Sequence, residues 1–327
     1  MTAAQGPIHY VLYLQKAEVL DQQRELVSRT LSDALPGVDI TFAGSVDAVP
    51  KGGVFDVVIA PTLPWLPDAL ARLAVYRWIH FLSAGVEKIW AMDFDKSAVL
   101  MTKSSGVHGA PMSEYAIGAM LYFTKQFGRF RDQARQALWQ RSWLGELADR
   151  QLTILGLGHI GQCLARRAKA FDMQVVGTLR TPRSVSHVDR VVALRDIGPE
   201  LQRTDFLVVC LPLTHVTQGL VDDALLSQLR PGAVLIDISR GGVVKSDALL
   251  RALDAGTLKG AALDVFERQP LPAESPLWHR DDLLITPHVS GTTPFYLERA
   301  LGVFIENVRA YQQGQPFTTA VSIDAGY

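Results

Sequence analysis

The sequence has few cysteines and no long uninterrupted apolar stretch. Its two cysteines, Cys163 and Cys210, match neither a disulfide framework nor a CxxC metal pattern, and we interpret both as core thiols. No apolar run reaches the roughly 18 residues that a membrane-spanning helix needs. The first residues lack the basic and apolar regions of a secretory signal peptide. We therefore expect a cytoplasmic protein with no membrane partner and no metal site.

An excess of charge of one sign is also missing. The chain has 32 Lys plus Arg against 33 Asp plus Glu. A nearly neutral chain has no global field that would attract nucleic acid or an anionic membrane, so we expect no nucleic-acid partner. The length of 327 residues is enough for two domains and a large buried core, which suits an enzyme with a cleft.

The first hundred residues alternate short apolar runs with polar, helix-like segments. Alternation of this kind predicts an α/β domain with a parallel sheet. A long helical pattern then starts at Pro111, a residue that suits the first turn of a helix, and we expect it to bridge two domains. The predicted strands of this first part are 8–14, 54–60, 77–82 and 98–102.

A second series of strand-like runs follows the bridging helix. Each run is short, rich in branched residues and followed by Gly, Pro or polar residues, as expected for strands buried on both faces. This pattern predicts a second doubly wound domain. A final helical pattern over 294–312 can return to the first domain. The predicted strands are 151–155, 174–178, 206–210, 233–238, 260–265 and 283–286.

A glycine-rich segment, G-L-G-H-I-G, lies between the first of these strands and a helical pattern. Its glycines permit a tight turn, close approach of the backbone to a pyrophosphate, and close packing of the helix on the strand. The amides that open the helix would face the anion. The segment therefore predicts a dinucleotide site. The expected cofactor-binding residues are Gly156, Gly158, His159, Ile160 and Gly161.

The end of the second strand of this domain indicates which nicotinamide cofactor is used. An NAD site normally has an acidic side chain about 20 residues past the glycines. No carboxylate occurs between Asp172 and Asp189, and Arg180 and Arg183 instead flank Thr181. Guanidinium groups suit a 2′-phosphate, which favours NADPH, with NAD still possible. The alternative is that both arginines are solvated loop charges.

Three chemistry-bearing residues follow three further predicted strands. Arg240, Glu267 and His288 should meet at one crevice, because ligands bind outside the carboxyl ends of the strands in open α/β sheets. His288 suits a proton donor to a carbonyl oxygen, Glu267 can fix its ring, and Arg240 can bind a substrate carboxylate. Asp264 can hold the nicotinamide carboxamide or cap a helix. The set predicts reduction of a 2-oxo acid.

Several motifs in one order resemble the D-2-hydroxyacid dehydrogenase family over nearly the whole chain. They are G-L-G-H-I-G, V-C-L-P-L-T at 209–214, S-R-G-G-V-V, A-L-D-V-F-E and T-P-H-V-S-G. The resemblance implies a Rossmann nucleotide domain, residues 104–292, inserted into a flavodoxin-like substrate domain, residues 1–103 and 293–327. It also implies that the family's catalytic Arg, Glu and His correspond to Arg240, Glu267 and His288.

Further site residues are implied by the same resemblance. The amides of the S-A-G-V loop at 83–86 would bind the substrate carboxylate, and Trp139 and Trp143 lie in a segment that resembles the family's dimer arm. We therefore expect a homodimer, with two ordinary core tryptophans as the alternative. The implied substrate-binding residues are Ala84, Gly85, Val86 and Arg240. The implied additional cofactor-binding residues are Cys210, Leu211, Pro212 and Ser239.

The arginines at the cofactor loop resemble the NADP-using glyoxylate and hydroxypyruvate reductase branch. We expect an NADPH-preferring reductase of small 2-oxo acids to D-2-hydroxy acids. We expect no additional carboxy-terminal regulatory domain, which argues against the longer phosphoglycerate dehydrogenases. Two alternatives remain: a co-repressor-like protein that binds nucleotide and partners, and an NAD-dependent dehydrogenase of another substrate, such as phosphoglycerate or phosphite. The substrate itself is not specified by the sequence.

Overall fold

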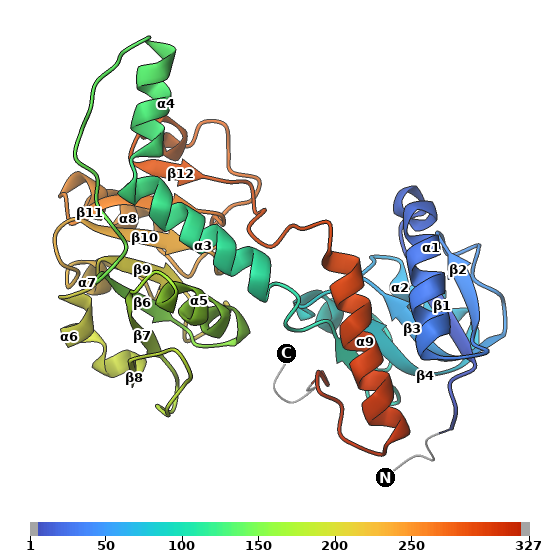
Figure 1. Ribbon diagram of the computed structural model, residues 1–327. Helices are drawn as coiled ribbons and strands as arrows, with labels where there is room; N and C mark the ends of the chain where they lie inside the picture. Colours follow the sequence, from blue (N-terminus) through green and yellow to red (C-terminus); the bar gives the residue numbers. More distant parts are fainter. Residues whose placement is uncertain (1–5, 322–327) are drawn as a thin grey trace. The chain divides into compact units, whose positions relative to one another are not determined.

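The computed structural model describes residues 6–321. The chain forms two compact units, which we call unit 1 (residues 1–108 and 293–327) and unit 2 (residues 109–292). Unit 2 is therefore inserted into the chain of unit 1, and each unit contains its own parallel sheet (Figure 1). The predicted fold class, two doubly wound α/β domains with one inserted into the other, is confirmed.

Unit 1 is built on a five-stranded parallel sheet with the order β2-β1-β3-β4-β5, the flavodoxin-like order. The four strands predicted in this part of the chain are present, and the edge strand β2 was not predicted. Its elements are β1 (Tyr10–Leu14), α1 (Ala17–Ala34), β2 (Asp39–Ala43), β3 (Gly53–Ala60), α2 (Leu66–Ala71), β4 (Leu73–Phe81), the 3-10 helix η1 (Glu87–Ala91), β5 (Leu100–Lys103) and α9 (Tyr296–Gln312).

The carboxyl-terminal parts of β1, β3 and β4 are buried on both faces, which explains their continuous apolar runs. Alternate residues of β3 point to opposite faces: Val57 and Ile59 join the core that includes α1 and α9, whereas Val58 and Ala60 join the core that includes α2. Helix α9 returns to this unit after the insertion, as the sequence predicted. Its residue Phe304 is fully buried.

Unit 2 is built on a seven-stranded parallel sheet with the order β12-β11-β10-β9-β6-β7-β8. The order reverses at β6, as in the doubly wound dinucleotide-binding fold. All six predicted strands are present, and the three-residue edge strand β8 was not predicted. The elements are α3 (Gly109–Thr124), α4 (Phe127–Arg135), β6 (Gln151–Leu155), α5 (His159–Lys169), β7 (Gln174–Thr178), β8 (Arg190–Val192), the 3-10 helix η2 (Leu194–Asp196), α6 (Gly198–Leu201), β9 (Phe206–Val209), α7 (Asp223–Leu226), β10 (Ala233–Asp237), α8 (Ser246–Asp254), β11 (Leu258–Leu263), the 3-10 helix η3 (Pro276–His279) and β12 (Leu283–Ile285).

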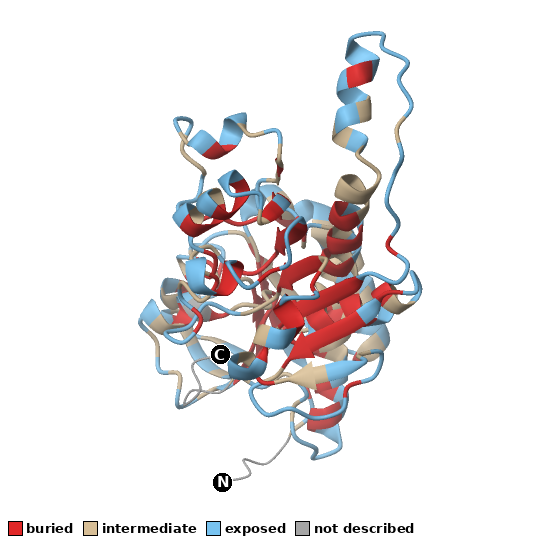
Figure 2. Cartoon of the chain, turned by 90° about the vertical axis from the view of Figure 1, so that its left-hand side faces the viewer, coloured by how far each residue is buried: buried red, intermediate tan, exposed pale blue. Residues whose placement is uncertain are grey.

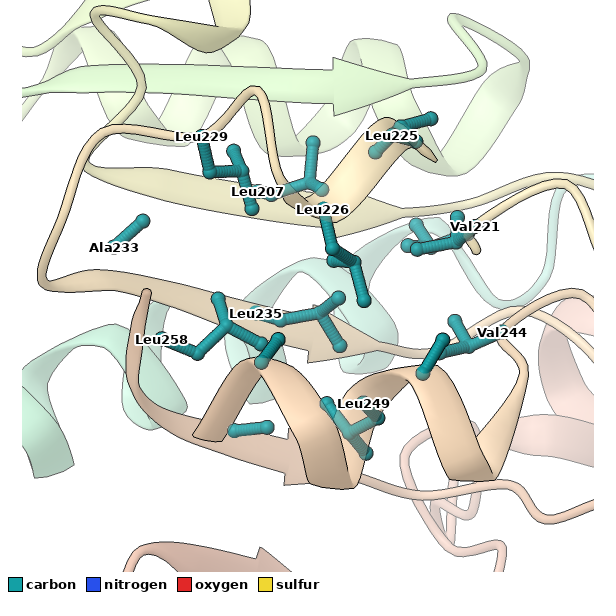
Figure 3. Packing of buried hydrophobic residues seen from close by; sticks show 14 of the residues in the cluster. Leu207, Val221, Leu225, Leu226, Leu229, Ala233, Leu235, Val244, Leu249 and Leu258 are labelled. Carbon is teal, nitrogen blue, oxygen red and sulfur yellow. The ribbon is translucent and has the colours of Figure 1, made fainter. Parts of the chain in front are cut away.

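Two apolar layers cover the sheet of unit 2, whose central strands are buried (Figure 2). On one face, Leu207 of β9 and Leu235 of β10 pack with Leu226 of α7 and Leu249 of α8 (Figure 3). On the other face, alternate residues of the same strands pack with α3 and α5. The period of two along each strand therefore fixes which helices lie on which face.

Helix α4 and the segment that follows it extend away from the sheet of unit 2 (Figure 1). Trp139 and Trp143 in this segment are 94% and 98% exposed. The alternative that they are core tryptophans is therefore wrong for the single chain. Over residues 6–321, none of the helices is both long and apolar enough to cross a membrane.

A buried histidine lies in the sheet of unit 1. His80 of β4 is fully buried, with Nδ1 2.7 Å from Thr102 Oγ1 and Nε2 3.1 Å from Ser104 Oγ. Trp78 Nε1 donates to Thr102 and Ser104 donates to the Phe81 carbonyl, so Thr102 donates to Nδ1 and Ser104 accepts from Nε2. The network thus satisfies the neutral ring. Burial lowers the pKa of His80 to about 3.

This depressed pKa predicts acid sensitivity of unit 1. The unfolded chain binds a proton at His80 near pH 6.5 and the folded chain only near pH 3, so stability is lost as pH falls between these values. From pH 7 to pH 5 the group should remove about 2 kcal/mol from the free energy of unfolding. Urea unfolding followed by tryptophan fluorescence tests this, since the buried Trp78 reports unit 1.

A His80→Gln variant should lose that part of the pH dependence, whatever its absolute stability. The exposed His215 provides the matched control, and His215→Gln should keep the slope of the unmodified protein. An equal slope in His80→Gln and the unmodified protein would contradict the account.

Candidate active site

The predicted site residues of unit 2 lie in loops that follow the carboxyl ends of its strands. The glycine-rich turn follows β6, the arginine loop follows β7, and the V-C-L-P-L-T loop follows β9. Arg240 follows β10, Glu267 follows β11 and His288 follows β12. Because all seven strands are parallel, these loops emerge at one edge of the sheet.

The glycine-rich turn has the conformation that a dinucleotide requires. Gly156 has φ +102°, and a Cβ at Gly161 would lie 2.2 Å from the Gly156 carbonyl oxygen, so both positions require glycine. A Cβ at Gly158 would meet no atom within 4 Å, which leaves room for a ligand there. Helix α5 begins at His159 without a side-chain cap. Its first amides are therefore available to a pyrophosphate, and the turn fits a dinucleotide.

The glycine-rich turn is tied to the two neighbouring strands. The Gly156 amide donates to Thr178 Oγ1 at 3.0 Å, and the Leu157 amide donates to the Thr178 carbonyl at 3.0 Å. A Cβ at Gly177 would lie 2.5 Å from the Leu157 side chain. Gly177 and Thr178 were not among the predicted site residues, although both directly precede the arginine loop. They hold the end of β7 against the turn.

The arginine loop is exposed. Arg180, Thr181 and Arg183 are exposed side chains at the end of β7. Within residues 6–321, neither arginine has an ion-pair partner. Two guanidinium groups that have no ion-pair partner in the described part of the chain are available to an anionic ligand, as the cofactor prediction requires.

The loop after β9 packs on the glycine-rich turn. The Cys210 amide donates to the Leu155 carbonyl at 2.9 Å, and a Cβ at Gly156 would lie 3.1 Å from the Cys210 carbonyl oxygen and 3.0 Å from the Leu211 side chain. Burial, reinforced by the charge of Asp237, raises the pKa of the Cys210 thiol well above its usual range. The backbone of Cys210 thus lies directly against the glycine-rich turn.

A buried carboxylate supports the loop that contains Arg240. Ser239 donates from its amide at 3.0 Å and its hydroxyl at 2.5 Å to Asp237 Oδ1. Burial, together with the nearby Asp264, raises the pKa of Asp237 to about 7. The exposed Arg240 guanidinium donates to the Ser239 carbonyl at 2.9 Å. One guanidinium nitrogen of Arg240 is thus tied to the neighbouring carbonyl, and the side chain is exposed to a ligand.

Asp264 fixes the segment that carries His288. Its fully buried carboxylate accepts from Thr286 Oγ1 at 2.6 Å, the Val289 amide at 2.8 Å and the Ser290 amide at 2.9 Å. His288 between them has φ +56°, a left-handed conformation that is costly for a residue with a side chain. Asp264 therefore has a structural role that the sequence did not predict. The expected contact with the nicotinamide carboxamide stays a prediction.

The predicted pairing of Glu267 with His288 is wrong. Oε1 of Glu267 accepts from the Ser246 amide at 2.9 Å, at the start of α8, where the helix dipole favours a carboxylate. Nδ1 of His288 lies 2.9 Å from Oε1 of Gln269 instead. The structure therefore brings His288 together with an amide side chain two residues further along the loop.

The reason lies in the path of the loop after β11. A Cβ at Gly241 would lie 1.8 Å from the Phe266 carbonyl oxygen, so the backbone of this loop is in direct contact with the loop after β10. The contact turns Glu267 toward α8 and leaves Gln269 facing His288. Glu267 was predicted to pair with His288 because it follows the strand within the A-L-D-V-F-E motif. In the sequence, the glycine at position 241 is the one indication that these two loops touch.

In unit 1, the predicted substrate loop follows β4. The Tyr296 hydroxyl donates to the Leu82 carbonyl, and burial raises the Tyr296 pKa, opposed by a hydrogen bond from the Ala84 backbone. Within the described part of the chain, the amides of Gly85 and Val86 have no hydrogen-bond partner. Both amides are therefore available to a ligand.

Comparison with known proteins assigns the family. The model for the D-isomer specific 2-hydroxyacid dehydrogenase, NAD binding domain, matches residues 117–290. Glyoxylate/hydroxypyruvate reductase A of Photorhabdus laumondii is 31% identical over 271 residues, 80% of this chain and 86% of that protein. The protein of the same name from Citrobacter koseri is 31% identical over 303 residues, 91% of this chain and 94% of that protein.

Solved structures extend the similarity to both units. A D-isomer specific 2-hydroxyacid dehydrogenase family protein from Aeromonas salmonicida has a TM-score of 0.83 and 32% identity, covering 96% of this chain and 99% of that one. The NADPH-dependent glyoxylate/hydroxypyruvate reductase of Sinorhizobium meliloti, in complex with NADP and sulfate, has a TM-score of 0.79 and 27% identity, covering 98% and 100%. The resemblance predicted from the motifs is thereby confirmed: the chain belongs to the D-isomer specific 2-hydroxyacid dehydrogenases and is an oxidoreductase with a dinucleotide-binding domain of the Rossmann type.

Proposed function

We propose that the protein is an NADPH-preferring reductase of small 2-oxo acids, such as glyoxylate and hydroxypyruvate, and forms D-2-hydroxy acids. One observation carries the proposal. The glycine-rich turn, Arg240 and His288 all lie at the carboxyl edge of the parallel sheet of unit 2. The relatives named glyoxylate/hydroxypyruvate reductase A support the substrate class. The cytoplasmic location expected from the sequence stays a prediction.

Each residue has a distinct role in the proposed reaction. A bound nicotinamide cofactor would supply the hydride that reaches the carbonyl carbon. Arg240 binds the substrate carboxylate and polarises the keto oxygen. The substrate-binding role expected for Ala84, Gly85 and Val86 of unit 1 stays a prediction. The proton on Nε2 of His288 passes to the oxygen, which completes the hydroxyl group and leaves the ring neutral. The ring then takes a new proton from solvent.

The exposed arginines of the loop after β7 support the cofactor preference. Arg180 and Arg183 present guanidinium groups that are free of ion pairs in the described chain, at the place where a ribose 2′-substituent is bound in this fold. A solved relative described as NADPH-dependent supports the same choice.

We predict a cofactor preference that depends on these arginines. The kcat/KM for glyoxylate reduction should be higher with NADPH than with NADH. Replacing Arg180 or Arg183 by Ala should raise the KM for NADPH by roughly tenfold or more, because each change removes a charge-assisted hydrogen bond. The same changes should barely affect NADH. Arg195→Ala, an exposed arginine elsewhere in unit 2, is the control. A preference for NADH in the unmodified protein would contradict the assignment.

A second prediction concerns the proton donor. His288→Gln should lower kcat by a factor of about 10² to 10⁴ and leave cofactor binding nearly intact, because general acid catalysis contributes on that scale. The exposed His279 provides a control, and His279→Gln should retain activity. Steady-state kinetics with a panel of 2-oxo acids, with fluorescence titration of NADPH, measures both effects. An unchanged kcat in His288→Gln would remove this residue from the mechanism.

The extended segment after α4 supports the homodimer expected from the sequence. Trp139 and Trp143 are almost fully exposed, and Leu138 and Leu144 beside them are 49% and 42% exposed. Large apolar side chains gathered on one projecting segment are typical of a protein interface. A second copy of the chain is the proposed partner.

The dimer gives a third prediction. The unmodified protein should sediment at twice the mass of one chain, and the double variant Trp139→Ser, Trp143→Ser should sediment largely as a monomer, because large exposed aromatic residues dominate interface energetics. Phe171→Ser, which changes a partly exposed aromatic residue outside this segment, should remain a dimer. A monomeric unmodified protein at micromolar concentration would contradict the proposal.

A further inference from the structure

Gln269 is placed against the ring of His288. Its Oε1 lies 2.9 Å from Nδ1, and it is the hydrogen-bond partner of that nitrogen within residues 6–321. Gln269 lies on the loop after β11, and His288 lies on the loop after β12. The contact thus joins two neighbouring strand ends.

The orientation of the Gln269 amide is fixed by a second hydrogen bond. Its Nε2 donates to the Phe266 carbonyl at 3.2 Å, and that carbonyl is held in place by its contact with Gly241. An amide with its nitrogen committed to a carbonyl must turn its oxygen to the other partner. The atom that faces His288 is therefore an acceptor.

An acceptor at this position determines which ring nitrogen exchanges its proton. An amide oxygen cannot donate, so Nδ1 of His288 must keep its proton in the charged and in the neutral ring. The exchangeable proton is then confined to Nε2. Asp264 adds to this constraint, because it holds the backbone on the carboxyl side of His288 through the Val289 and Ser290 amides.

The charged groups of unit 2 near this ring have other partners. From the loop after β11, the Asp264 carboxylate accepts from Thr286, Val289 and Ser290, and Glu267 accepts from Ser246. From the loop after β10, Arg240 donates to the Ser239 carbonyl, and from α3 the Tyr115 hydroxyl bonds Thr286 Oγ1 at 2.7 Å. In the described part of unit 2, therefore, the ring is hydrogen-bonded to a neutral amide and to no carboxylate.

We propose that Gln269 is the positioning residue for His288: it fixes the ring with Nδ1–H directed at an amide oxygen and withholds the negative charge that would favour the imidazolium. The inference rests on the proposed role of His288 as the proton donor. The consequence concerns the pH profile. Reduction needs the charged ring, so its kcat/KM should fall at a lower pH than it would with a carboxylate at position 269. Oxidation needs the neutral ring, so its kcat/KM should rise at a correspondingly lower pH.

The pH profile of kcat/KM for glyoxylate reduction with NADPH tests the proposal. In Gln269→Glu the basic limb should move to higher pH by about 1 to 3 units, the range produced by an adjacent opposite charge. Gln269→Met keeps the size of the side chain and removes its hydrogen bonds, so it should lower kcat about tenfold or more and leave the Kd for NADPH unchanged. Glu274→Gln, a change at an exposed carboxylate of the same loop, should leave the profile in place.

A measurement without turnover separates this inference from the proposed function. In ¹⁵N-histidine-labelled protein, the ring nitrogens of His288, assigned by comparison with His288→Gln, should show a proton on Nδ1 throughout the titration. The titration midpoint should be higher in Gln269→Glu. If this shift is seen and no 2-oxo acid is reduced, the inference holds and the proposed function fails. If glyoxylate is reduced but the midpoint stays in place, or if it moves with Glu267→Gln instead, the inference is wrong.

Discussion

The carboxylate of Asp264 holds the segment on which the proposed chemistry depends. It is fully buried and accepts three hydrogen bonds, from the Thr286 hydroxyl and from the amides of Val289 and Ser290. Hydrogen bonds to a charged group contribute about 1.5–3 kcal/mol each. Together they exceed the roughly 1–3 kcal/mol that a left-handed residue with a side chain costs. The strained backbone of His288 is therefore sustained by one side chain of the neighbouring strand.

Close backbone contacts between strand ends extend this organisation across unit 2. Gly241 allows the loop after β10 to touch the Phe266 carbonyl, and Gly156 allows the dinucleotide turn to touch the loop after β9. A side chain at Gly161 would collide with the turn itself. The proposed cofactor and proton-donor residues thus lie on loops that constrain one another, which provides the preorganisation that catalysis requires.

The sequence was sufficient to predict the parallel sheets, because strands buried on both faces leave unbroken apolar runs. It was insufficient for β2 and β8, which lie at the edges of their sheets and are only partly buried. The dinucleotide turn could be predicted because its function depends on local backbone geometry. The partner of His288 could not, since the choice between Glu267 and Gln269 depends on the path of the loop after β11, and a contact with a distant loop sets that path.

The most direct test of the account follows the reacting hydrogen itself. Hydroxypyruvate would be reduced with NADPH that carries deuterium at both C4 positions of the nicotinamide ring, and the product analysed by NMR and chiral chromatography. The account predicts D-glycerate with deuterium at C2 and a hydroxyl proton derived from solvent, since the hydride comes from the cofactor and the proton from the His288 ring. The L isomer, or D-glycerate without deuterium at C2, would contradict it.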